Sequence, residues 1–237
     1  MENAPQNTAQ ITAELESKYG IRAVAVQADV SKEHDCELLI KQALITFDKI
    51  DILVNNAGLS MRALFNDLDL SVLKNLMDVN FWGTVYSTKY ALPEILKTKG
   101  SVIGVSSIAG YRGLPGRTGY SASKFAMNGF MEALRTELLK TGVHVMVACP
   151  GFTASNIRVT ALAKDGAAHG ETSMEEGKMM TADEVAGRIV DGIAGRKRTL
   201  IMTGQGKLTV WINKLLPALA DKLVFNHFTK EKNALIK

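Results

Sequence analysis

The sequence predicts an α/β fold in which a doubly wound parallel sheet carries helices on both faces. Short apolar segments alternate with longer segments of helical periodicity along most of the 237 residues, and this order of elements builds parallel sheets. The apolar segments are almost uninterrupted, as in strands that are buried on both faces. Small and polar residues directly follow four of these segments, at the end of the sheet where ligands bind in such folds.

The first part of the chain is predicted to contain two helices and two strands. Residues 7–19 have helical character, and Gly20 is a typical residue after a helix C-terminus. The run RAVAVQAD (22–29) predicts a strand, and Ser31 is the expected N-cap of the helix that follows. The run IDILVNNAG (50–58) predicts a second, buried strand.

The later elements alternate in the same way. A long helix is expected over residues 71–98, with an interruption at Pro93. Residues 120–140 predict another helix with one apolar face. The remaining predicted elements are strands at 101–107, 143–151 and 198–203 and a helix at 181–195.

The composition is that of a globular protein, with 46% hydrophobic and 22% charged residues. No linker or repeat divides the chain, so we expect a single domain over residues 1–237, with a core at 7–203 and a basic extension at 204–237. Cys36 and Cys149 belong to no CxxC motif, which favours a reducing compartment such as the cytoplasm. The four histidines form no HExxH or Cys/His cluster, so no metal site is expected.

The positive charge is concentrated near the end of the chain. Residues 207–237 contain six Lys against Asp221 and Glu231, and they account for the whole formal net charge of +4. A generally basic surface is therefore not expected, and no nucleic-acid partner is predicted. The chain contains no apolar run of about 18 residues or more, so no membrane span is predicted.

The stretch RTGYSASKFA (117–126) places Tyr120 and Lys124 one helical turn apart. A phenol and an ammonium at this spacing share one helix face and can converge on a single point. The same spacing is compatible with a solvated helix face, and the pair alone does not distinguish the two interpretations.

Six short stretches, taken together, resemble the short-chain dehydrogenase/reductase family in its standard-length form. They are ADV (28–30), NNAG (55–58), Asn80 within MDVNFWGT, VSSIAG (105–110), YSASK (120–124) and PGFTASNI (150–157). They occur in the order and at the spacing of the family, with Ser107 placed 13 residues before Tyr120. The resemblance implies a Rossmann-like fold and an NAD(P)-dependent oxidoreductase that interconverts an alcohol and a ketone or aldehyde by hydride transfer.

The resemblance implies four catalytic residues. Reduction of a carbonyl needs a hydride from nicotinamide and a proton for the developing alkoxide, and Tyr120 would be the general acid/base. Lys124 would lower the pKa of this phenol, which is about 10 when free, and would hydrogen-bond the nicotinamide ribose. Ser107 would hold the substrate oxygen, and Asn80 would hold a water that relays protons to Lys124. In the alternative interpretation, Ser107 is a turn residue, and Asn80 packs within its helix or kinks it.

The resemblance also implies that the cofactor is NAD(P), with NADP the preferred choice. The residues implied in cofactor binding are Asp29, Val30, Asn55, Ala57, Gly58, Tyr120, Lys124, Pro150, Gly151, Thr153 and Ser155. Asp29 and Val30 would contact the adenine ring, the NNAG segment would line the adenosine pocket, and the stretch after Pro150 would face the nicotinamide carboxamide. Alternatively, Asp29 leads into the next helix, while the asparagines and the Pro-Gly pair only form turns.

One motif of the family is absent, because the sequence contains no TGxxxGxG turn. In the family this turn follows the first strand and binds the pyrophosphate at a helix N-terminus. In the family's strand order 3-2-1-4-5-6-7, the missing strands separate RAVAVQAD from IDILVNNA. We therefore expect a truncated form with unpaired strand edges and poor dinucleotide binding. The glycine-rich runs at 110–116 and 204–206 lie in a different context.

Residues 158–180 occupy the place of the family's substrate-covering loop. Their Gly-rich, Met-containing composition suits a mobile lid over an apolar substrate. The substrate-binding candidates are Ser107, Tyr120, Leu114 and Phe152, with Met61 and Met179 as further apolar candidates. Packing in the core or in loops is the alternative interpretation for the apolar residues.

The extension at 204–237 has the spacing of an amphipathic helix. Its apolar positions are Leu208, Trp211, Ile212, Leu215, Leu219 and Leu223, with Lys207, Lys214 and Lys222 between them. Two interpretations stay open: peripheral contact of 207–225 with an anionic membrane, or packing on the protein's own body or on a partner subunit. Pro217 is expected to kink the helix in either case.

The leading hypothesis is an NAD(P)-dependent oxidoreductase with a small, apolar carbonyl or alcohol substrate. The resemblance implies a homodimer or homotetramer that packs the helices at 71–98 and 120–140 across subunits. The alternative is a non-catalytic interaction protein of the same fold, or an inactive truncated form that cannot bind dinucleotide. A Ser hydrolase is not supported, because neither GVSSIAG nor GYSAS satisfies GxSxG.

Overall fold

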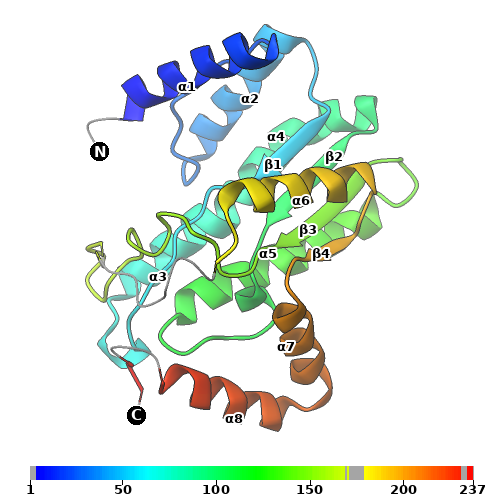
Figure 1. The fold of residues 1–237 in the computed structure, drawn as a ribbon. Coiled ribbons are helices and arrows are strands. Elements are labelled where there is room, and N and C mark those ends of the chain that lie inside the picture. The colour runs from blue at the N-terminus through cyan, green and yellow to red at the C-terminus, as the bar shows by residue number, and fades with distance from the viewer. Residues whose placement is uncertain (1–3, 169, 171–178, 231–233, 237) are drawn as a thin grey trace.

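A computed structural model describes residues 4–168, 170, 179–230 and 234–236. It contains a four-stranded parallel sheet with the strand order β1-β2-β3-β4. The strands are β1 (Ile52–Asn55), β2 (Ser101–Val105), β3 (His144–Cys149) and β4 (Thr199–Ile201). Helices flank this sheet (Figure 1), so the predicted α/β class with a parallel sheet is confirmed.

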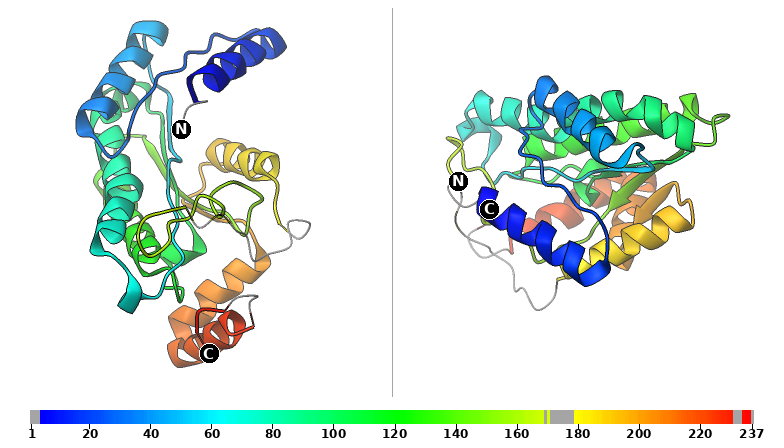
Figure 2. Two further views of the ribbon diagram at one scale, coloured as in Figure 1. Left: turned by 90° about the vertical axis from the view of Figure 1, so that its left-hand side faces the viewer. Right: turned by 90° about the horizontal axis from the view of Figure 1, so that it is seen from above.

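The helices lie on both faces of the sheet, as Figure 2 shows. On one face α4 (Gly83–Thr98) packs on β1 and β2, and α5 (Thr118–Glu137) packs on β3. α2 (Glu33–Phe47) packs against α4, while α6 (Ala182–Ala194) packs on β3 from the other face. The other helical segments are α1 (Ala4–Tyr19), α3 (Leu70–Met77), α7 (Gly204–Leu215), α8 (Pro217–Phe228) and the short turns η1 (Phe65–Asp67), η2 (Asp78–Trp82) and η3 (Ile108–Gly110).

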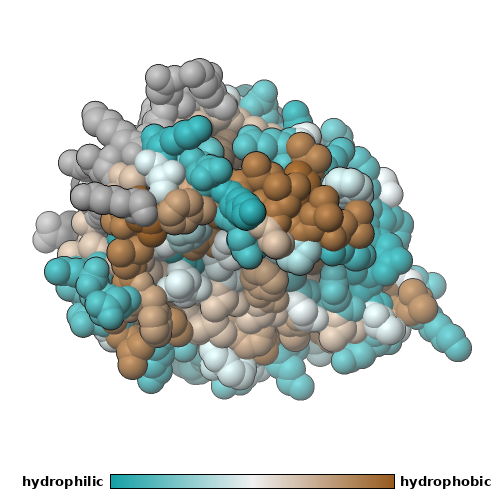
Figure 3. Space-filling model, turned by 90° about the horizontal axis from the view of Figure 1, so that it is seen from below, coloured by the Kyte–Doolittle hydropathy of each residue, from teal (hydrophilic) through white to brown (hydrophobic). Residues whose placement is uncertain are grey.

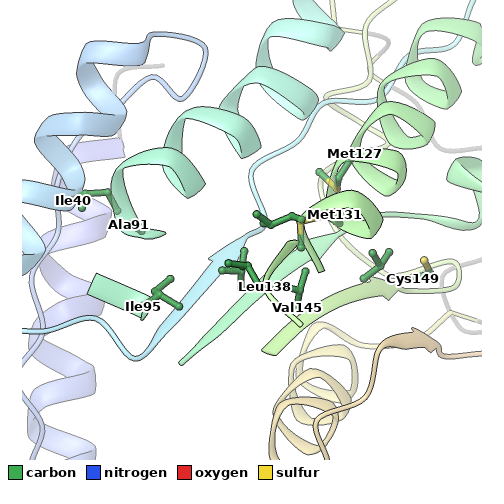
Figure 4. Close-up of a cluster of buried hydrophobic side chains, with 11 residues drawn as sticks. Ile40, Ala91, Ile95, Met127, Met131, Leu138, Val145 and Cys149 are labelled. Carbon is green, nitrogen blue, oxygen red and sulfur yellow. The ribbon is translucent and has the colours of Figure 1, made fainter. Parts of the chain in front are cut away.

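Side chains that alternate along β2 and β3 build a separate core on each face of the sheet. Val145 and Cys149 point toward α4 and α5, where they join Met131 in one cluster (Figure 4). Ile103 and Met146 point the other way, into a cluster with α6. All six residues of β3 are buried, which explains why its sequence is apolar without interruption.

The predicted helix at 71–98 consists of three consecutive segments. α3 ends at Met77, the single π-helical turn η2 follows, and α4 continues to Thr98. A π turn inserts an extra residue into the helix and is frequent at functional sites; here it contains the fully buried Asn80. Pro93 lies inside α4 without ending it, since the fully buried Ala91 and Ile95 hold the helix on the core.

The segment at 22–29 was predicted to be a strand, and this prediction is wrong, because the segment forms no strand. β-branched residues form a strand only where a neighbouring strand supplies hydrogen-bond partners. Among the described strands, β1 pairs with β2 alone and is an edge strand. Its Ile52 and Val54 are exposed, as is Val24 in the unpaired segment. These exposed side chains beside the edge strand are the unpaired apolar edges that we expected from the sequence.

The end of α1 agrees with the prediction from the sequence, and the beginning of α2 differs from it. Gly20 ends α1 as expected, with a positive φ of 63° and its N–H donated to Glu16 O at 2.9 Å. Ser31 is not the N-cap of α2, because Lys32 takes that position without a capping side-chain hydrogen bond. The hydroxyl of Ser31 instead donates to Asp29 Oδ1 at 2.7 Å.

The C-terminal extension forms two helices instead of one kinked helix. α7 ends at Leu215, and Pro217 is the first residue of α8. Proline is well tolerated there, because the first residue of a helix has no intrahelical acceptor for its N–H. α7 packs on β4 and η3, and α8 packs on α7 at the foot of the molecule in Figure 1.

Candidate active site

Tyr120 and Lys124 lie on the first two turns of α5, and both are buried. Tyr120 is 8% exposed and Lys124 is 3% exposed, which excludes a solvated helix face. The Lys124 Nζ lies 5.9 Å from the centroid of the Tyr120 ring and donates a hydrogen bond to Val105 O at 2.8 Å. Val105 ends β2, so the ammonium lies at the carboxyl end of the sheet, where ligands bind in doubly wound folds.

Ser107 lies two residues beyond the end of β2. It caps η3, because its Oγ accepts a hydrogen bond from Ala109 N at 3.2 Å. Its hydroxyl lies near enough to the phenol of Tyr120 to act on the pKa of that group, in the lowering direction. The turn interpretation and the placement beside the phenol therefore both hold for this serine.

Asn80 projects from η2 and links the loop after β1 to α5. Its Oδ1 accepts a hydrogen bond from Leu59 N at 2.7 Å, and its Nδ2 donates to Leu59 O at 2.9 Å. The same Nδ2 donates to Ser123 Oγ at 2.8 Å, and the Ser123 hydroxyl donates to Tyr120 O at 2.8 Å. These contacts make Asn80 a structural link, as the packing interpretation requires, and the water relay stays a prediction.

The NNAG segment serves both the sheet and the site. Asn55 is buried, and its Nδ2 donates to Thr88 Oγ1 at 3.1 Å, which ties β1 to α4. Gly58 lies against the catalytic candidates, because a Cβ there would be 3.2 Å from Asn80 Oδ1 and 3.5 Å from Lys124 Nζ. Ala57, which lies between Asn55 and Gly58 in the sequence, is exposed.

Burial governs the ionisation of the Tyr120–Lys124 pair. It lowers the pKa of the Lys124 ammonium to about 8, because the charged form loses its hydration. It also raises the pKa of the Tyr120 phenol, against smaller opposing effects of the Ser107 hydroxyl and the Arg117 charge. The resemblance implied a lowered phenol pKa; in this structure the pKa is raised, since desolvation of the phenolate outweighs the neighbouring charges.

Asp29 and Val30 lie just before α2. The Asp29 carboxylate accepts hydrogen bonds from Ser31 N at 3.1 Å and from the Ser31 hydroxyl, so it leads into the helix as the alternative interpretation requires. Val30 packs tightly on the start of α4, since a Cβ at Gly83 would lie 2.9 Å from Val30 Cγ2. The structure therefore gives both residues a local packing role.

The stretch after β3 turns away from the sheet at Pro150 and Gly151. A Cβ at Gly151 would lie 2.5 Å from Thr203 Cγ2, so only glycine fits this approach to the segment after β4. The hydroxyl of Thr153 donates back to Gly151 O at 3.1 Å, and Ser155 is exposed. Both hydroxyls thus lie on the loop that leaves the carboxyl end of β3.

The four apolar pocket candidates fall into two groups. Met61 and Leu114 pack in the same cluster as Tyr120, and Met61 is fully buried. Phe152 and Met179 lie near one another through Arg158, whose guanidinium is 5.9 Å from the Phe152 ring and contacts the Met179 sulfur. The predicted lid at 158–180 includes residues 169 and 171–178, which lie outside the described residues.

Sequence reasoning missed three groups that hold the site together: the hydroxyl of Ser123, the carbonyl of Val105, and the backbone of Leu59. Ser123 lies within the YSASK stretch, three residues after Tyr120, and this helical spacing was a signal for it. The two backbone partners left no signal, because every residue carries the same peptide group.

A doubly wound parallel sheet with serine, tyrosine and lysine side chains gathered at one carboxyl end indicates a dinucleotide-dependent oxidoreductase. Comparison with known families agrees. The family model described as short chain dehydrogenase matches residues 1–166, and the chain belongs to this family. The family is one of oxidoreductases, and its cofactor is NAD(P).

Named relatives are similar over most of the chain. Dehydrogenase/reductase SDR family member 7B of Mus musculus is 32% identical over 195 residues, which are 81% of this chain and 60% of the relative. The 11-beta-hydroxysteroid dehydrogenase-like 4A of Arabidopsis thaliana is 34% identical over 213 residues, which are 89% of this chain and 69% of the relative. The chain thus spans 60% of the length of the mouse relative.

Solved structures share the fold. A short-chain dehydrogenase from Streptomyces avermitilis superposes with a TM-score of 0.71 at 23% identity, covering 94% of this chain and 84% of that one. An alcohol dehydrogenase from Thermococcus sibiricus, complexed with 5-hydroxy-NADP, has a TM-score of 0.71 at 21% identity, covering 84% of this chain and 80% of that one.

Proposed function

We propose that this chain interconverts an alcohol and a ketone or aldehyde with NAD(P), using Tyr120 as the general acid/base. The observation that carries the proposal is the burial of the Lys124 ammonium beside the Tyr120 ring, with its hydrogen bond going to an uncharged carbonyl. A buried ammonium of this kind is costly to the fold, and such groups with displaced pKa values cluster at functional sites.

Each side chain has a distinct task in this proposal. The Tyr120 hydroxyl gives its proton to the carbonyl oxygen in reduction and takes it back in oxidation. The raised pKa keeps the phenol protonated at neutral pH, which suits the reductive direction. Ser107, whose hydroxyl acts on the pKa of that phenol, would donate to the same substrate oxygen and stabilise its developing charge.

The residues of this chain suit the nicotinamide ribose of the cofactor better than its pyrophosphate. Lys124 offers a buried ammonium for ribose hydroxyls, and Gly58 and Gly151 keep the backbone open beside the site. When bound, NAD(P) supplies or accepts the hydride. For the pyrophosphate end the sequence has no TGxxxGxG turn, so that end has no matching cradle. We prefer NADP over NAD, as in the complex of the Thermococcus sibiricus enzyme.

The substrate we propose is apolar. Met61 and Leu114 adjoin Tyr120 in one apolar cluster, and Phe152 is partly exposed on the loop after β3. Because one relative carries the name 11-beta-hydroxysteroid dehydrogenase-like 4A, hydroxysteroids and ketosteroids are the first substrates to test. We further propose a cytoplasmic homodimer or homotetramer that packs the helices at 71–98 (α3, η2 and α4) and 120–140 (α5) across subunits.

The test is oxidation of NADPH or NADH by the full chain at millimolar cofactor, with ketosteroids and other apolar ketones. The Tyr120→Phe variant should lose about 10²- to 10⁴-fold of the turnover, the usual contribution of general acid catalysis. Tyr111→Phe is the matched control, because Tyr111 is half-buried close by, outside the Tyr120–Lys124 pair. Equal turnover in Tyr120→Phe and the parent would contradict the proposal.

The second candidate is a non-catalytic protein of the same fold, which the absent phosphate turn favours. If this candidate is right, the chain turns over no ketone, and neither dinucleotide changes its thermal unfolding temperature. Turnover that depends on Tyr120 would exclude it.

A further inference from the structure

Three polar contacts join the helical hairpin formed by α7 and α8 to the body of the protein, beside the buried Ala220 and Phe228. The guanidinium of Arg112 donates to Asn213 Oδ1 at 3.0 Å and to Asp221 Oδ1 at 2.5 Å. The Asn213 side chain in turn donates to Tyr111 O at 2.9 Å. The side of the hairpin that faces the protein is therefore held in good part by an arginine, an amide and a carboxylate.

The opposite side of the hairpin carries apolar side chains into solvent. Two sets share the spacing i, i+3, i+7 and so lie on one face of each helix. They are Leu208, Trp211 and Leu215 on α7 and Leu216, Leu219 and Leu223 at and beyond the start of α8, each between 43% and 57% exposed. Apolar side chains gather on this side of the molecule in the view from below (Figure 3).

This distribution reverses that of a helix packed on its own protein, which turns its apolar face inward. Exposure of several large apolar side chains to water is energetically unfavourable. A contiguous exposed patch of this kind marks a surface that binds a membrane or another protein. About half of the surface of each of these six side chains is therefore not covered by the protein's own body. The sequence left two interpretations, packing on the body or on a partner subunit, or contact with a membrane, and cover by a partner subunit or by a bilayer both stay compatible with this exposure.

The charge beside the apolar side chains is positive. Lys207, Lys214, Lys222 and Lys230 are all exposed, whereas Asp221 is the one acidic residue between positions 204 and 230. Asp221 is already engaged by Arg112. A surface of leucine and tryptophan flanked by lysines matches the boundary of a bilayer that contains anionic lipids.

We propose that the α7–α8 hairpin binds to the surface of an anionic lipid bilayer, with its six apolar side chains in the acyl-chain boundary and its lysines at the headgroups. A second copy of the chain is a poorer occupant, because a symmetric contact would bring the same lysines together across the interface. Among the described residues, no helix has the length and hydropathy needed to cross a bilayer.

The hairpin also lies close to the candidate active site. Phe228 near the end of α8 shares a small pocket with Pro115 and Arg117, and Arg117 is the N-cap of α5, the helix that carries Tyr120. A bilayer held by α7 and α8 would therefore lie near the site at which an apolar substrate reacts. The bilayer contact itself is independent of any activity.

The two tryptophans of the chain allow a direct measurement. Trp211 belongs to the proposed surface, and Trp82 lies on η2, stacked on Tyr86 with ring centroids 5.5 Å apart. The full chain carrying Trp82→Phe is mixed with vesicles of phosphatidylcholine alone or with phosphatidylserine, the latter also with acyl chains brominated near the headgroup. We expect co-sedimentation with the anionic vesicles, a blue shift of Trp211 emission, and quenching by the brominated chains. The Trp211→Phe chain, which reports from Trp82, should show neither change in emission.

Two pairs of variants separate the apolar and the electrostatic contributions. Leu208→Ser with Leu215→Ser should abolish sedimentation, whereas Leu139→Ser, which alters a leucine that is 75% exposed elsewhere, should not. Lys207→Glu with Lys214→Glu should weaken binding to anionic vesicles by about tenfold or more. As the matched control, Lys89→Glu with Lys74→Glu makes the same change of charge on α3 and α4.

Three results would overturn the proposal. The first is the absence of vesicle binding by the parent chain. The second is equal binding by the parent and the Leu208/Leu215 variant. The third is a Trp211 blue shift that grows with protein concentration without lipid and disappears in the Leu208/Leu215 variant, because it would assign the surface to a second copy of the chain.

Discussion

At the scale of single residues, Ser123 joins two parts of the candidate site. Its hydroxyl donates to Tyr120 O and accepts from the Asn80 amide. The side chains of Asn80 and Ser123 are both completely buried. A buried donor that loses its acceptor costs more than the bond itself contributes, so the link is sensitive to a single substitution.

We predict that Ser123→Ala lowers the free energy of unfolding by about 1–3 kcal/mol, because it leaves an Asn80 N–H without its acceptor. Urea denaturation monitored by circular dichroism measures the loss. Ser121→Ala is the control: Ser121 is buried on the same helix, and its hydroxyl accepts one bond, from Leu114 N at 3.2 Å. An equal or smaller loss in Ser123→Ala than in Ser121→Ala would contradict the role of the link.

His144 at the start of β3 should make stability depend on pH. Its ring is hydrogen-bonded to Ser101 Oγ and Lys197 O at 3.2 and 2.8 Å. Burial lowers the pKa of this imidazole, against the bond to Lys197, and the charges of Arg196 and Arg135 lower it further. The unfolded chain therefore binds the proton more readily than the folded one, and folding favours the neutral ring.

The stabilisation from His144 is accordingly present above pH of about 6.5, the ordinary histidine pKa, and is lost as the pH falls toward the lowered pKa of the folded state. Urea denaturation at pH 5.5 and 7.5 compares the two conditions. His144→Asn should reduce the difference between them. The same difference in the parent and the variant would assign the pH dependence to other groups.

At the scale of elements, Gly110 in the run GYRGLPG (110–116) and Gly206 in the run GQG (204–206) serve packing. A Cβ at Gly110 would lie 2.7 Å from Asn128 Nδ2, 2.8 Å from Ser106 Oγ and 2.9 Å from Lys124 O, so η3 can pack on α5 only with glycine at this position. Gly206 is similar, since a Cβ there would lie 2.7 Å from Ile108 Cδ1. These contacts explain one glycine in each of the two glycine-rich runs, neither of which lies in the sequence context of a phosphate-binding turn.

We predict that Gly110→Ala destabilises the protein by about 1–3 kcal/mol, the usual cost of overpacking. Gly113→Ala in the same loop should change stability by less than about 0.5 kcal/mol, because a Cβ at Gly113 meets nothing within 4 Å. Thermal unfolding of both variants tests the pair. Equal losses would show that the backbone conformation of the loop, and not the contact with α5, requires glycine.

At the scale of the whole molecule, the candidate site lies in the packed interior, whereas one edge of the sheet has no strand partner among the described residues. Asn80, Tyr120 and Lys124 are buried, and Ser123 links the Asn80 amide to the Tyr120 backbone, while β1 is an edge strand and the segment at 22–29 has no strand partner. The phosphate-binding turn would belong to the part of the sheet between them.

We therefore predict that the 237-residue chain binds NADH and NADPH weakly, with dissociation constants above the micromolar range, because its sequence has no TGxxxGxG turn to donate hydrogen bonds to the pyrophosphate. Isothermal titration calorimetry with each dinucleotide measures this directly. A micromolar dissociation constant for either would show that another group of this chain holds the pyrophosphate.

The sequence by itself determined the parallel α/β class, the order of the elements and the local pairing of Tyr120 with Lys124. These features depend on short-range periodicity and on helical spacing, which a sequence carries in full. It also predicted Gly20 correctly as the residue that ends α1.

The tertiary structure alone decided the rest. It showed that 22–29 forms no strand, since strand formation needs a partner far away in sequence, and that Ser107 and Asn80 converge on α5 through contacts that no local pattern encodes. It raised the Tyr120 pKa against expectation, because burial is a property of the folded molecule. It also turned the apolar face of α7 and α8 outward: helical periodicity defines a face, but only packing decides which way that face points.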